Sequence, residues 1–291
     1  MQVFGRAIAR FAILVPGLII AYFGVDKILP YFNNKLPVGL AILFTYILCA
    51  YILAPALLRI FRIIKTPVHL PIYSITPDGL ASDPINISII ATRRQLIRTM
   101  EKAGWHMADP HTIHNIFKMG ISILFNRTYK NAPMSSLYMF GRKQDIAFEI
   151  PIGSSAGERH HVRFWATTYD MKKKNLDVKG IHWHNRRSHV FGDSLLWVGA
   201  ASLDNGVALI RHNLQFTHMI HPDTNLERDM IVSQLKTQKL LDKVTYIKLG
   251  SPYKLVNRVI NGYLHTDGKM ALVNLKEPKR PTGLRSRNRS R

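Results

Sequence analysis

The sequence predicts an α+β protein in which an N-terminal two-helix transmembrane hairpin precedes a mixed, largely antiparallel β-sheet domain with flanking helices. Three observations support this prediction. Two apolar segments lie in the first 65 of the 291 residues. From residue 137 onward, short runs rich in aromatic and β-branched residues are separated by turn residues, as is typical of strands. Helical patterns stand before and after those strands rather than between them, which favours α+β over a βαβ repeat.

The clearest transmembrane signal is Leu36–Leu58, an uncharged apolar segment in which Thr45 is nearly the only polar side chain. As a helix it is about 34 Å long, which is enough to cross a hydrocarbon core of about 30 Å. A core helix of a soluble protein is the alternative, but such helices are rarely apolar over this length. The segment therefore predicts a membrane-spanning helix over about residues 36–58.

The first apolar segment, Phe11–Val25, is shorter and spans only about 22 Å as a helix. It predicts a spanning helix over about residues 8–25, provided that Arg6 and Arg10 extend to the lipid headgroups. A cleaved signal peptide is the rival interpretation. Aromatic residues stand where small residues would mark a cleavage site, so we expect an uncleaved hairpin.

Basic residues flank the two predicted helices unequally. Two arginines precede the first helix and three basic residues follow the second, whereas the connecting loop holds Lys27 and Lys35 offset by Asp26. The positive-inside rule then places both ends of the anchor, residues 1–65, in the cytoplasm. The domain that follows, residues 66–275, is therefore expected to be cytoplasmic.

Capping residues and apolar periodicity predict three helices within the domain. Thr92 is an N-cap signal ahead of Arg93–Ala103, and Gly104 is a C-terminal stop signal. The other two helical patterns are Thr112–Phe125 and Asn225–Leu241.

The predicted strands follow an irregular stretch that ends near Pro84. Asp204-Asn205-Gly206 predicts a hairpin turn between two of them and Asp267-Gly268 a further turn, because these pairs supply the positive φ that tight turns need. The predicted strands are Ile85–Ile90, Leu137–Phe140, Ile146–Ile150, His161–Thr168, Leu195–Ser202, Val207–Ile210, Val244–Leu249 and Met270–Leu275. Residues 276–291, dense in arginine with proline and serine, are predicted to be a disordered basic tail.

The chain is strongly basic, with a formal net charge of +22. Such a charge indicates anionic lipid or nucleic acid as a surface partner. Because the apolar anchor already places the chain at a lipid bilayer, we expect anionic lipid headgroups to bind the basic tail. Nucleic acid is disfavoured, since no recognition motif accompanies the basic residues. The single cysteine, Cys49, excludes an intrachain disulfide and a Cys-rich zinc site.

Two histidine-containing segments are candidates for chemistry, and the first is His160–Trp165. Strand alternation places His161 and Arg163 on one face and leaves the apolar Val162 and Phe164 for the other. Because the apolar face belongs to the core, we expect His161 and Arg163 to line a surface or cleft.

The second segment is Thr217–Asp229, in which His218 and His221 are three residues apart with carboxylates nearby. It predicts either a metal or acid–base group, or a loop in which Asp223 caps the next helix and Glu227 complements its dipole. The second interpretation is favoured, and we predict no metal site.

Named catalytic motifs are missing from the rest of the sequence. It has no zinc-protease H-E-x-x-H, no phosphate-binding glycine loop and no G-x-S-x-G nucleophile motif. His182–His189 is expected to be a solvated polar loop. The residues therefore do not identify a cofactor.

Four segments, taken in order, resemble the LssY C-terminal domain family, a bacterial membrane-associated domain. They are Ser136–Phe148, His160–Trp165, Trp197–Ala201 and Thr217–Asp229, and the resemblance covers roughly residues 72–250. In this family the domain is often joined to a lipid-phosphatase-like or DedA-like membrane region. The resemblance implies the bacterial inner membrane, a cell-envelope or phospholipid setting and envelope proteins as partners, but no particular reaction. This chain departs from the family pattern in having only a two-helix anchor, and His221 and Asn225 where acidic residues are common.

Two functions from different classes remain open. In the first, the domain is an accessory or interaction module whose charged motif residues fix the fold through ion pairs. In the second, it is a membrane-tethered hydrolase acting on a phosphorylated or lipid-linked substrate. The residues for the second are catalytic His161, His218 and Glu227, with Arg142, Asp145, Arg163 and Arg228 for binding. The first is favoured, because the charged motifs come without a recognisable nucleophile or a complete set of metal ligands.

Overall fold

The computed structural model describes residues 17–53, 70–77, 79, 81–125, 127, 129–153, 158–167, 194–210, 215–257 and 262–276. Within them, the centre of the domain is an eight-stranded sheet. Its strands are β3 (Ile87–Ala91), β4 (His106–Met107), β7 (Ile146–Pro151), β8 (Glu158–Thr167), β9 (Leu195–Ile210), β10 (Gln215–Ile220), β11 (Leu241–Lys248) and β14 (Lys269–Leu275). The order is β11-β14-β3-β9-β8-β7-β4, with β10 paired to β9. Among these pairs β14 and β3 run parallel and the others antiparallel, so the sheet is mixed and largely antiparallel as predicted.

A second, four-stranded antiparallel sheet covers one face of the first. Its strands are β1 (Tyr73–Ile75), β2 (Ala81–Pro84), β5 (Tyr138–Met139) and β6 (Arg142–Lys143), in the order β2-β1-β5-β6. Met139 of β5 and Phe140 of the turn that follows pack with Trp165 and Val198 of the large sheet. A separate hairpin joins β12 (Tyr253–Asn257) to β13 (Gly262–Thr266).

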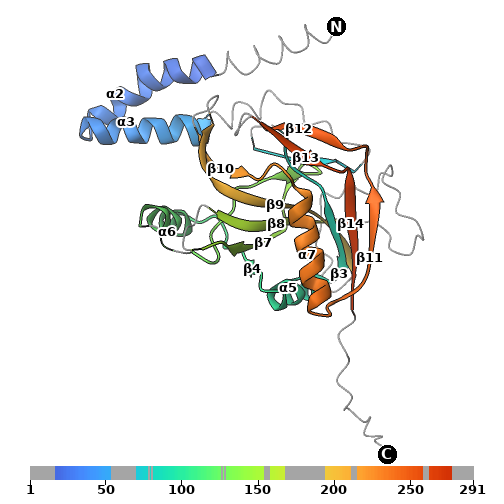
Figure 1. Cartoon of the computed structure of the whole chain (residues 1–291). Helices are drawn as coiled ribbons and strands as arrows, with labels where there is room; N and C mark the ends of the chain where they lie inside the picture. The colour runs from blue at the N-terminus through green and yellow to red at the C-terminus, as the bar shows by residue number, and fades with distance from the viewer. Residues whose placement is uncertain are drawn as a thin grey trace, which may run out of the picture.

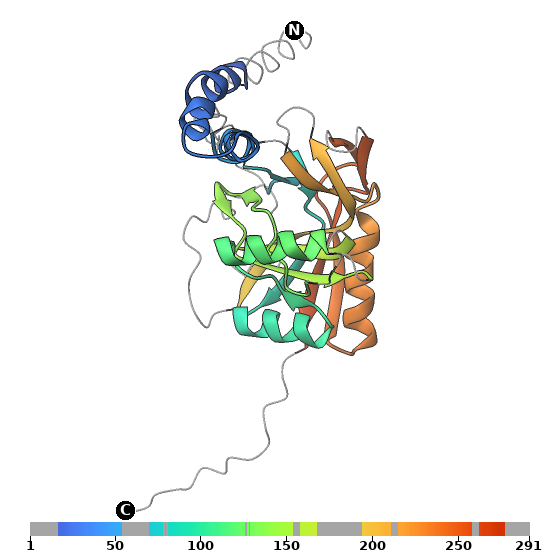
Figure 2. The same ribbon diagram turned by 90° about the vertical axis from the view of Figure 1, so that its left-hand side faces the viewer.

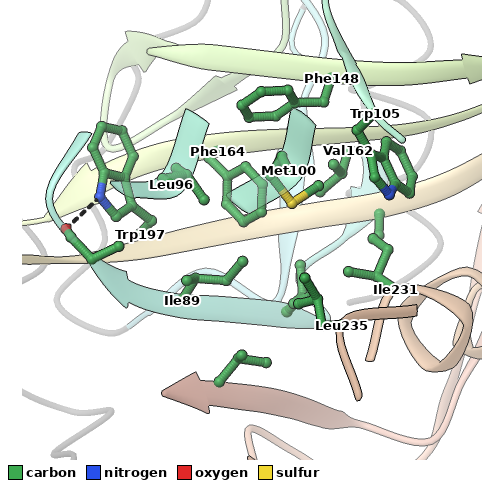
Figure 3. Packing of buried hydrophobic residues seen from close by; sticks show 14 of the residues in the cluster. Ile89, Leu96, Met100, Trp105, Phe148, Val162, Phe164, Trp197, Ile231 and Leu235 are labelled. Atoms are coloured by element: carbon green, nitrogen blue, oxygen red, sulfur yellow. Dashed lines mark hydrogen bonds between the residues drawn. The ribbon is translucent and has the colours of Figure 1, made fainter. Parts of the chain in front are cut away.

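Two helices, α5 (Arg93–Lys102) and α7 (Asn225–Thr237), cover the opposite face of the large sheet (Figure 1). Their buried side chains meet those of β3, β7 and β8 in the main core (Figure 3). The labelled members of this core are Ile89, Leu96, Met100, Trp105, Phe148, Val162, Phe164, Trp197, Ile231 and Leu235. The third helix of the domain, α6 (Ile113–Leu124), lies away from this core.

The three predicted helices of the domain are confirmed, with small changes at their ends. The Thr92 hydroxyl accepts a hydrogen bond from the Gln95 backbone N–H at 3.1 Å, which is the predicted N-cap. Gly104 follows α5 with a φ of +91°, a left-handed conformation that suits glycine at a helix end. Helix α7 ends at Thr237, four residues before the predicted end at Leu241, because β11 begins there.

The predicted hairpin turn at Asp204-Asn205-Gly206 is wrong, because β9 continues through these residues as one strand. Gly206 has a φ of +102°, so the signal for positive φ was sound. The register between β9 and β10 slips at this point, since His218 pairs with Val207 and Ile220 with Asp204. The glycine therefore supplies a β-bulge rather than a chain reversal.

Other parts of the strand prediction also need correction. The stretch before Pro84, expected to be irregular, holds β1 and β2. The predicted turn at Asp267-Gly268 is confirmed, since Gly268 has a φ of +72° and the turn leads from β13 into β14. The polar segment 182–189 and most of the predicted tail, from residue 277, lie outside the described residues.

The N-terminal segment forms two antiparallel helical arms (Figure 1). Their elements are the π-helical turn η1 (Gly24–Ile28), α2 (Leu29–Asn33), α3 (Val38–Ile47) and the π-helical turn η2 (Leu48–Leu53). Gly24 lies where the arms touch, and a Cβ added to it would stand 2.8 Å from the Cys49 Sγ atom. The glycine therefore permits the close approach of the arms.

The described helices do not support the predicted spans over residues 8–25 and 36–58. Among the described residues, no helix combines the length and the apolar character needed to cross a membrane. The first arm does not end near Val25 but continues to Asn33, and Asp26 and Lys27 pair with each other on its exposed surface at 2.9 Å. Residues 8–16 and 54–58 of the predicted spans lie outside the described part of the chain.

Candidate functional site: a buried ion cluster

Strand β8 directs its basic side chains to one face of the sheet. Arg159, His161 and Arg163 alternate with Val162 and Phe164, and only the latter two belong to the main core under α5 and α7. The expected division of the strand into two faces is thus confirmed. The expectation that His161 and Arg163 line a surface or cleft is wrong, because His161 is 1% exposed and Arg163 is 4% exposed. The four-stranded sheet covers them.

Three carboxylates from three strands surround these basic side chains. Glu149 stands opposite His161 in β7, and Asp204 stands opposite Arg159 in β9. Asp83 comes from β2 in the covering sheet. The result is a buried ion cluster, which consists of Asp83, Glu149, Arg159, His161, Arg163 and Asp204.

Each basic member of the buried ion cluster contacts at least one carboxylate. The Arg159 guanidinium donates to the Glu149 Oε2 atom at 2.6 Å and to the Asp204 Oδ2 atom at 2.9 Å. Arg163 donates through Nη1 to the Asp83 Oδ2 atom at 2.8 Å. His161 lies between the two aspartates, with Nε2 at 3.3 Å from Asp83 Oδ2 and Nδ1 at 3.2 Å from Asp204 Oδ1. Three acidic groups therefore face three basic groups.

Burial disfavours the charged form of every member of the cluster, and neighbouring opposite charges favour it. The balance of the two effects sets the direction in which each pKa moves. Burial disfavours the Asp83 carboxylate, but Arg163 and His161 outweigh it and hold the pKa of Asp83 below its ordinary value. Burial also disfavours the His161 imidazolium, but the Asp204 charge outweighs it and raises the pKa of His161. Asp83 is therefore ionised and His161 is protonated over a wider pH range than usual.

Glu149 is the exception within the cluster. Burial raises the pKa of this carboxyl to about 7, although Arg159 acts in the opposite direction. Its Oε1 atom is buried without a hydrogen-bond partner. Glu149 is thus the member whose charge changes near neutral pH.

Several further polar atoms of the cluster region lack full hydrogen bonding. The Arg163 Nε and Ser202 Oγ atoms are buried without a hydrogen-bond partner. The His161 Nδ1 atom is within ion-pair distance of Asp204 but outside hydrogen-bond geometry. Guanidinium groups bind one oxygen each of Asp83, Glu149 and Asp204. Within the described residues, no three His, Cys, Asp or Glu side chains are arranged to hold a metal ion.

Two of the predicted binding residues, Arg142 and Asp145, form a separate pair. The Arg142 Nη1 atom lies 2.5 Å from both Asp145 carboxylate oxygens. Asp145 Oδ2 also accepts from the Ala166 backbone N–H at 2.7 Å, and Arg142 donates to the Ala166 carbonyl oxygen. The pair therefore ties β6 of the small sheet to β8 of the large one.

Glu227 and Arg228 lie on the other side of the sheet, in the first turn of α7. The buried Glu227 carboxylate is 2.8 Å from the His160 Nδ1 atom, a contact between α7 and the helix-covered face of β8. Arg228 donates to Asp229 and to Asp267, at 2.8 Å in each case. Burial opposes the Arg228 charge, but these two aspartates raise its pKa. Both residues link α7 to its neighbours.

His218 lies in β10, opposite Val207, and its side chain is outside the described part of the chain. His161 stands opposite Ser202 of β9. Val207 lies five residue steps along β9 from Ser202, which corresponds to about 16 Å. His221 makes a local contact, since its Nδ1 atom accepts from the Asp223 backbone N–H at 3.2 Å.

The predicted site residues are thus distributed over several places. The structure brings His161 and Arg163 together, but it places Arg142 with Asp145, Glu227 with His160, and Arg228 with Asp267. Four members of the buried ion cluster were missed: Asp83, Glu149, Arg159 and Asp204. A charged residue inside an otherwise apolar predicted strand, such as Glu149 in Ile146–Ile150, is the sequence signal that could have found one of them.

Comparison with known proteins places this arrangement in a family. Residues 68–270 match the model of the LssY C-terminus family. The chain belongs to that family. No curated protein and no solved structure matches it. The matched range contains the buried ion cluster and all three domain helices, so they are parts of the LssY domain.

Proposed function

We propose that the LssY domain is an accessory or interaction module held at the bacterial inner membrane by its N-terminal helical arms, residues 17–53. The observation that supports this is the surface of the arms, where large apolar side chains are exposed. They include Leu18, Ile19, Phe23, Val25, Val38, Leu40, Ile42, Leu43, Phe44, Ile47 and Ile52. Contiguous apolar surface of this kind marks a contact with a membrane or a partner.

The inside of the two-arm hairpin supports the same placement. Within the described residues 17–53, three of the four buried positions are small residues, namely Gly24, Ala41 and Ala50, and the fourth is Ile20. Helices packed in lipid place small residues between them and large apolar residues on their outer surface. A pair of helices in water does the reverse and buries its large apolar side chains. Thr45, a polar residue on α3, donates its hydroxyl to the Ala41 carbonyl oxygen at 2.8 Å.

The buried ion cluster favours an accessory module over the hydrolase alternative. General acid–base catalysis requires groups within hydrogen-bond reach of a substrate. His161 is buried between Asp83 and Asp204, and Arg163 is buried against Asp83. The charged side chains of the motif are thus engaged in holding two sheets together, and envelope proteins are the proposed partners of the domain surface.

A lysine substitution in α3 tests the membrane placement. In the double variant Leu43→Lys, Ile47→Lys, each lysine would cost about 2.5–3.5 kcal/mol at the centre of a bilayer. In water, exposed positions such as these would change stability by about 0.5 kcal/mol or less. We expect the wild-type full chain to stay with membranes through alkaline carbonate extraction, and the double variant to be released.

The control is Leu226→Lys, which changes an equally apolar side chain that is 56% exposed on α7. This variant should fractionate as the wild type does. Equal retention of the α3 double variant and the control would contradict the proposal, as would release of the wild-type chain.

A further inference from the structure

Helix α6 carries an apolar face that the protein does not cover. Ile113 is 89% exposed and Phe117 is 69% exposed, and Ile116, Ile121 and Phe125 are exposed as well. These positions recur at intervals of three and four residues, so they lie along one side of the helix. Of the α6 side chains that the structure describes, only Ser122 is buried.

This exposure is unusual for a helix of twelve residues. An isolated helix of this length is marginal in water and is ordinarily stabilised by burying its apolar side against the protein. The apolar side of α6 faces outward instead. We therefore expect the apolar side of α6 to meet something other than water.

The position of α6 indicates what it meets. Figures 1 and 2 both show α6 on the side of the domain to which the helical arms extend. In Figure 2 the helix is seen lengthwise, whereas α3 is seen nearly end-on, so the two axes run across each other. Arms inserted along their length would hold α6 flat, parallel to the membrane surface.

The charge around α6 suits anionic headgroups. Residues 105–135 contain Lys118, Arg127 and Lys130 against one acidic residue, Asp109. Lys118 lies with its Nζ atom 4.2 Å from the centroid of the Tyr129 ring, and Arg127 lies 5.8 Å from that of Phe125. Cations beside an apolar helix face are the pattern of helices that lie in a membrane interface.

We infer that α6 is an in-plane amphipathic helix that rests its Ile113–Phe117 side in the headgroup region of the bilayer. This inference depends on the proposed membrane placement. It gives the LssY domain a second contact with lipid and fixes which side of the domain faces the membrane. The opposite side, where α7 and β11 lie, then faces away from the bilayer (Figure 1).

Site-directed fluorescence on the full chain tests this inference. In a Cys49→Ser background, Phe117→Cys and Ile113→Cys would each carry a nitrobenzoxadiazole label, and Leu226→Cys would be the control. All three positions are exposed, so labelling is compatible with folding. The chains would be reconstituted in vesicles of phosphatidylethanolamine and phosphatidylglycerol. We expect blue-shifted emission at 113 and 117, with strong quenching by nitroxide-labelled lipid, and neither effect at 226.

The outcomes separate the inference from the proposed function. If the chains float with the vesicles but the 113 and 117 labels report water, the α6 contact is wrong while the membrane placement stands. If they are blue-shifted without quenching by lipid, a protein surface or a second copy covers α6, and the inference is overturned. Chains that fail to float would instead contradict the membrane placement itself.

Discussion

At the scale of single residues, the main feature of the LssY domain is that six ionisable side chains are buried together. Removing such charges from water costs several kcal/mol for each ion, and their mutual attraction repays this only while every partner is present. Asp83 illustrates the point, because the Asp83 Oδ2 atom faces both Arg163 and His161. The cluster therefore stabilises the contact between the two sheets as a complete set.

Replacing Asp83 by asparagine should be strongly destabilising. Asp83→Asn leaves the buried Arg163 and His161 without their shared carboxylate, and the expected loss is about 3–5 kcal/mol in the free energy of unfolding. Urea titration of the full chain in detergent, followed by tryptophan fluorescence, would measure it. Asp229→Asn is the matched control, since Asp229 is half exposed and Arg228 keeps Asp267; a loss of about 1 kcal/mol or less is expected there. Equal losses would show that burial does not govern these pairs.

Glu149 should make stability depend on pH. The pKa of Glu149 is about 7 in the folded chain against an ordinary value of 4.5, so the folded chain holds a proton that the unfolded chain has released. This contribution to stability is complete below the ordinary value and is lost as the pH rises to about 7. Relative to Glu149→Gln, which cannot titrate, the wild type should lose about 3 kcal/mol over that interval. His161 is present in both proteins, so its titration does not contribute to the difference between their pH profiles. Parallel profiles would therefore contradict the raised pKa of Glu149.

Single residues also show which parts of the buried ion cluster the sequence alone could predict. Alternation along β8 correctly placed His161 and Arg163 together, because strand geometry is local. Their partner Asp83 is 80 residues from Arg163 in the chain, in a strand too short to have a sequence pattern of its own. Its role depends on how two sheets pack, which residue spacing does not encode.

At the scale of elements, the sequence predicted conformation better than topology. Gly206 has the positive φ that Asn-Gly suggested, yet it bends a continuous strand. The turn between β5 and β6 shows the converse. There Phe140 and Gly141 both have positive φ, at 55° and 72°, as a two-residue type I′ turn requires. No propensity predicts phenylalanine at such a position; burial of its ring offsets the strain, since Phe140 is a core residue.

Replacing the bulge glycine should weaken the pairing of β9 with β10. Gly206→Ala would place a Cβ atom at a φ of +102°, and the expected cost is about 1–2 kcal/mol in the free energy of unfolding. Gly250→Ala is the control, because Gly250 has an ordinary φ and no atom within 4 Å of an added Cβ. That change should be neutral or slightly stabilising. Urea titration would measure both variants, and a neutral Gly206→Ala would show that the bulge relaxes without glycine.

At the scale of the whole molecule, two surfaces are built in opposite ways. The domain buries its large apolar side chains in two cores, whereas the helical arms bury mainly small residues, together with Ile20, and expose most of their large ones. The four motifs of the domain indicated its family correctly, whereas the anchor predicted from the two apolar segments stays a proposal, since no described helix could cross a membrane by itself. The function did not follow from either, because the charged motif residues are engaged with one another.

The orientation of the whole chain is expected from its flanking charges. Basic residues follow the second arm at Arg59, Arg62 and Lys65. The positive-inside rule then predicts a cytoplasmic domain, so alkaline phosphatase fused to the C-terminus should be inactive and green fluorescent protein should be fluorescent. A second variant has glutamine at these three positions and arginine in the loop between the arms, through Asn33→Arg and Asn34→Arg. It moves the positive charge from the domain end of the second arm to the loop between the arms. It should raise phosphatase activity and lower fluorescence.

The control for orientation is a variant in which the three lysines at 172–174 become glutamine. It removes the same number of positive charges, but these lie more than a hundred residues from the second arm, beyond the range in which flanking charge sets topology. Both reporters should therefore read as in the wild type. An active phosphatase on the wild-type chain would place the domain on the far side of the membrane. In that orientation the inferred α6 contact would lie in the outer leaflet of the same bilayer.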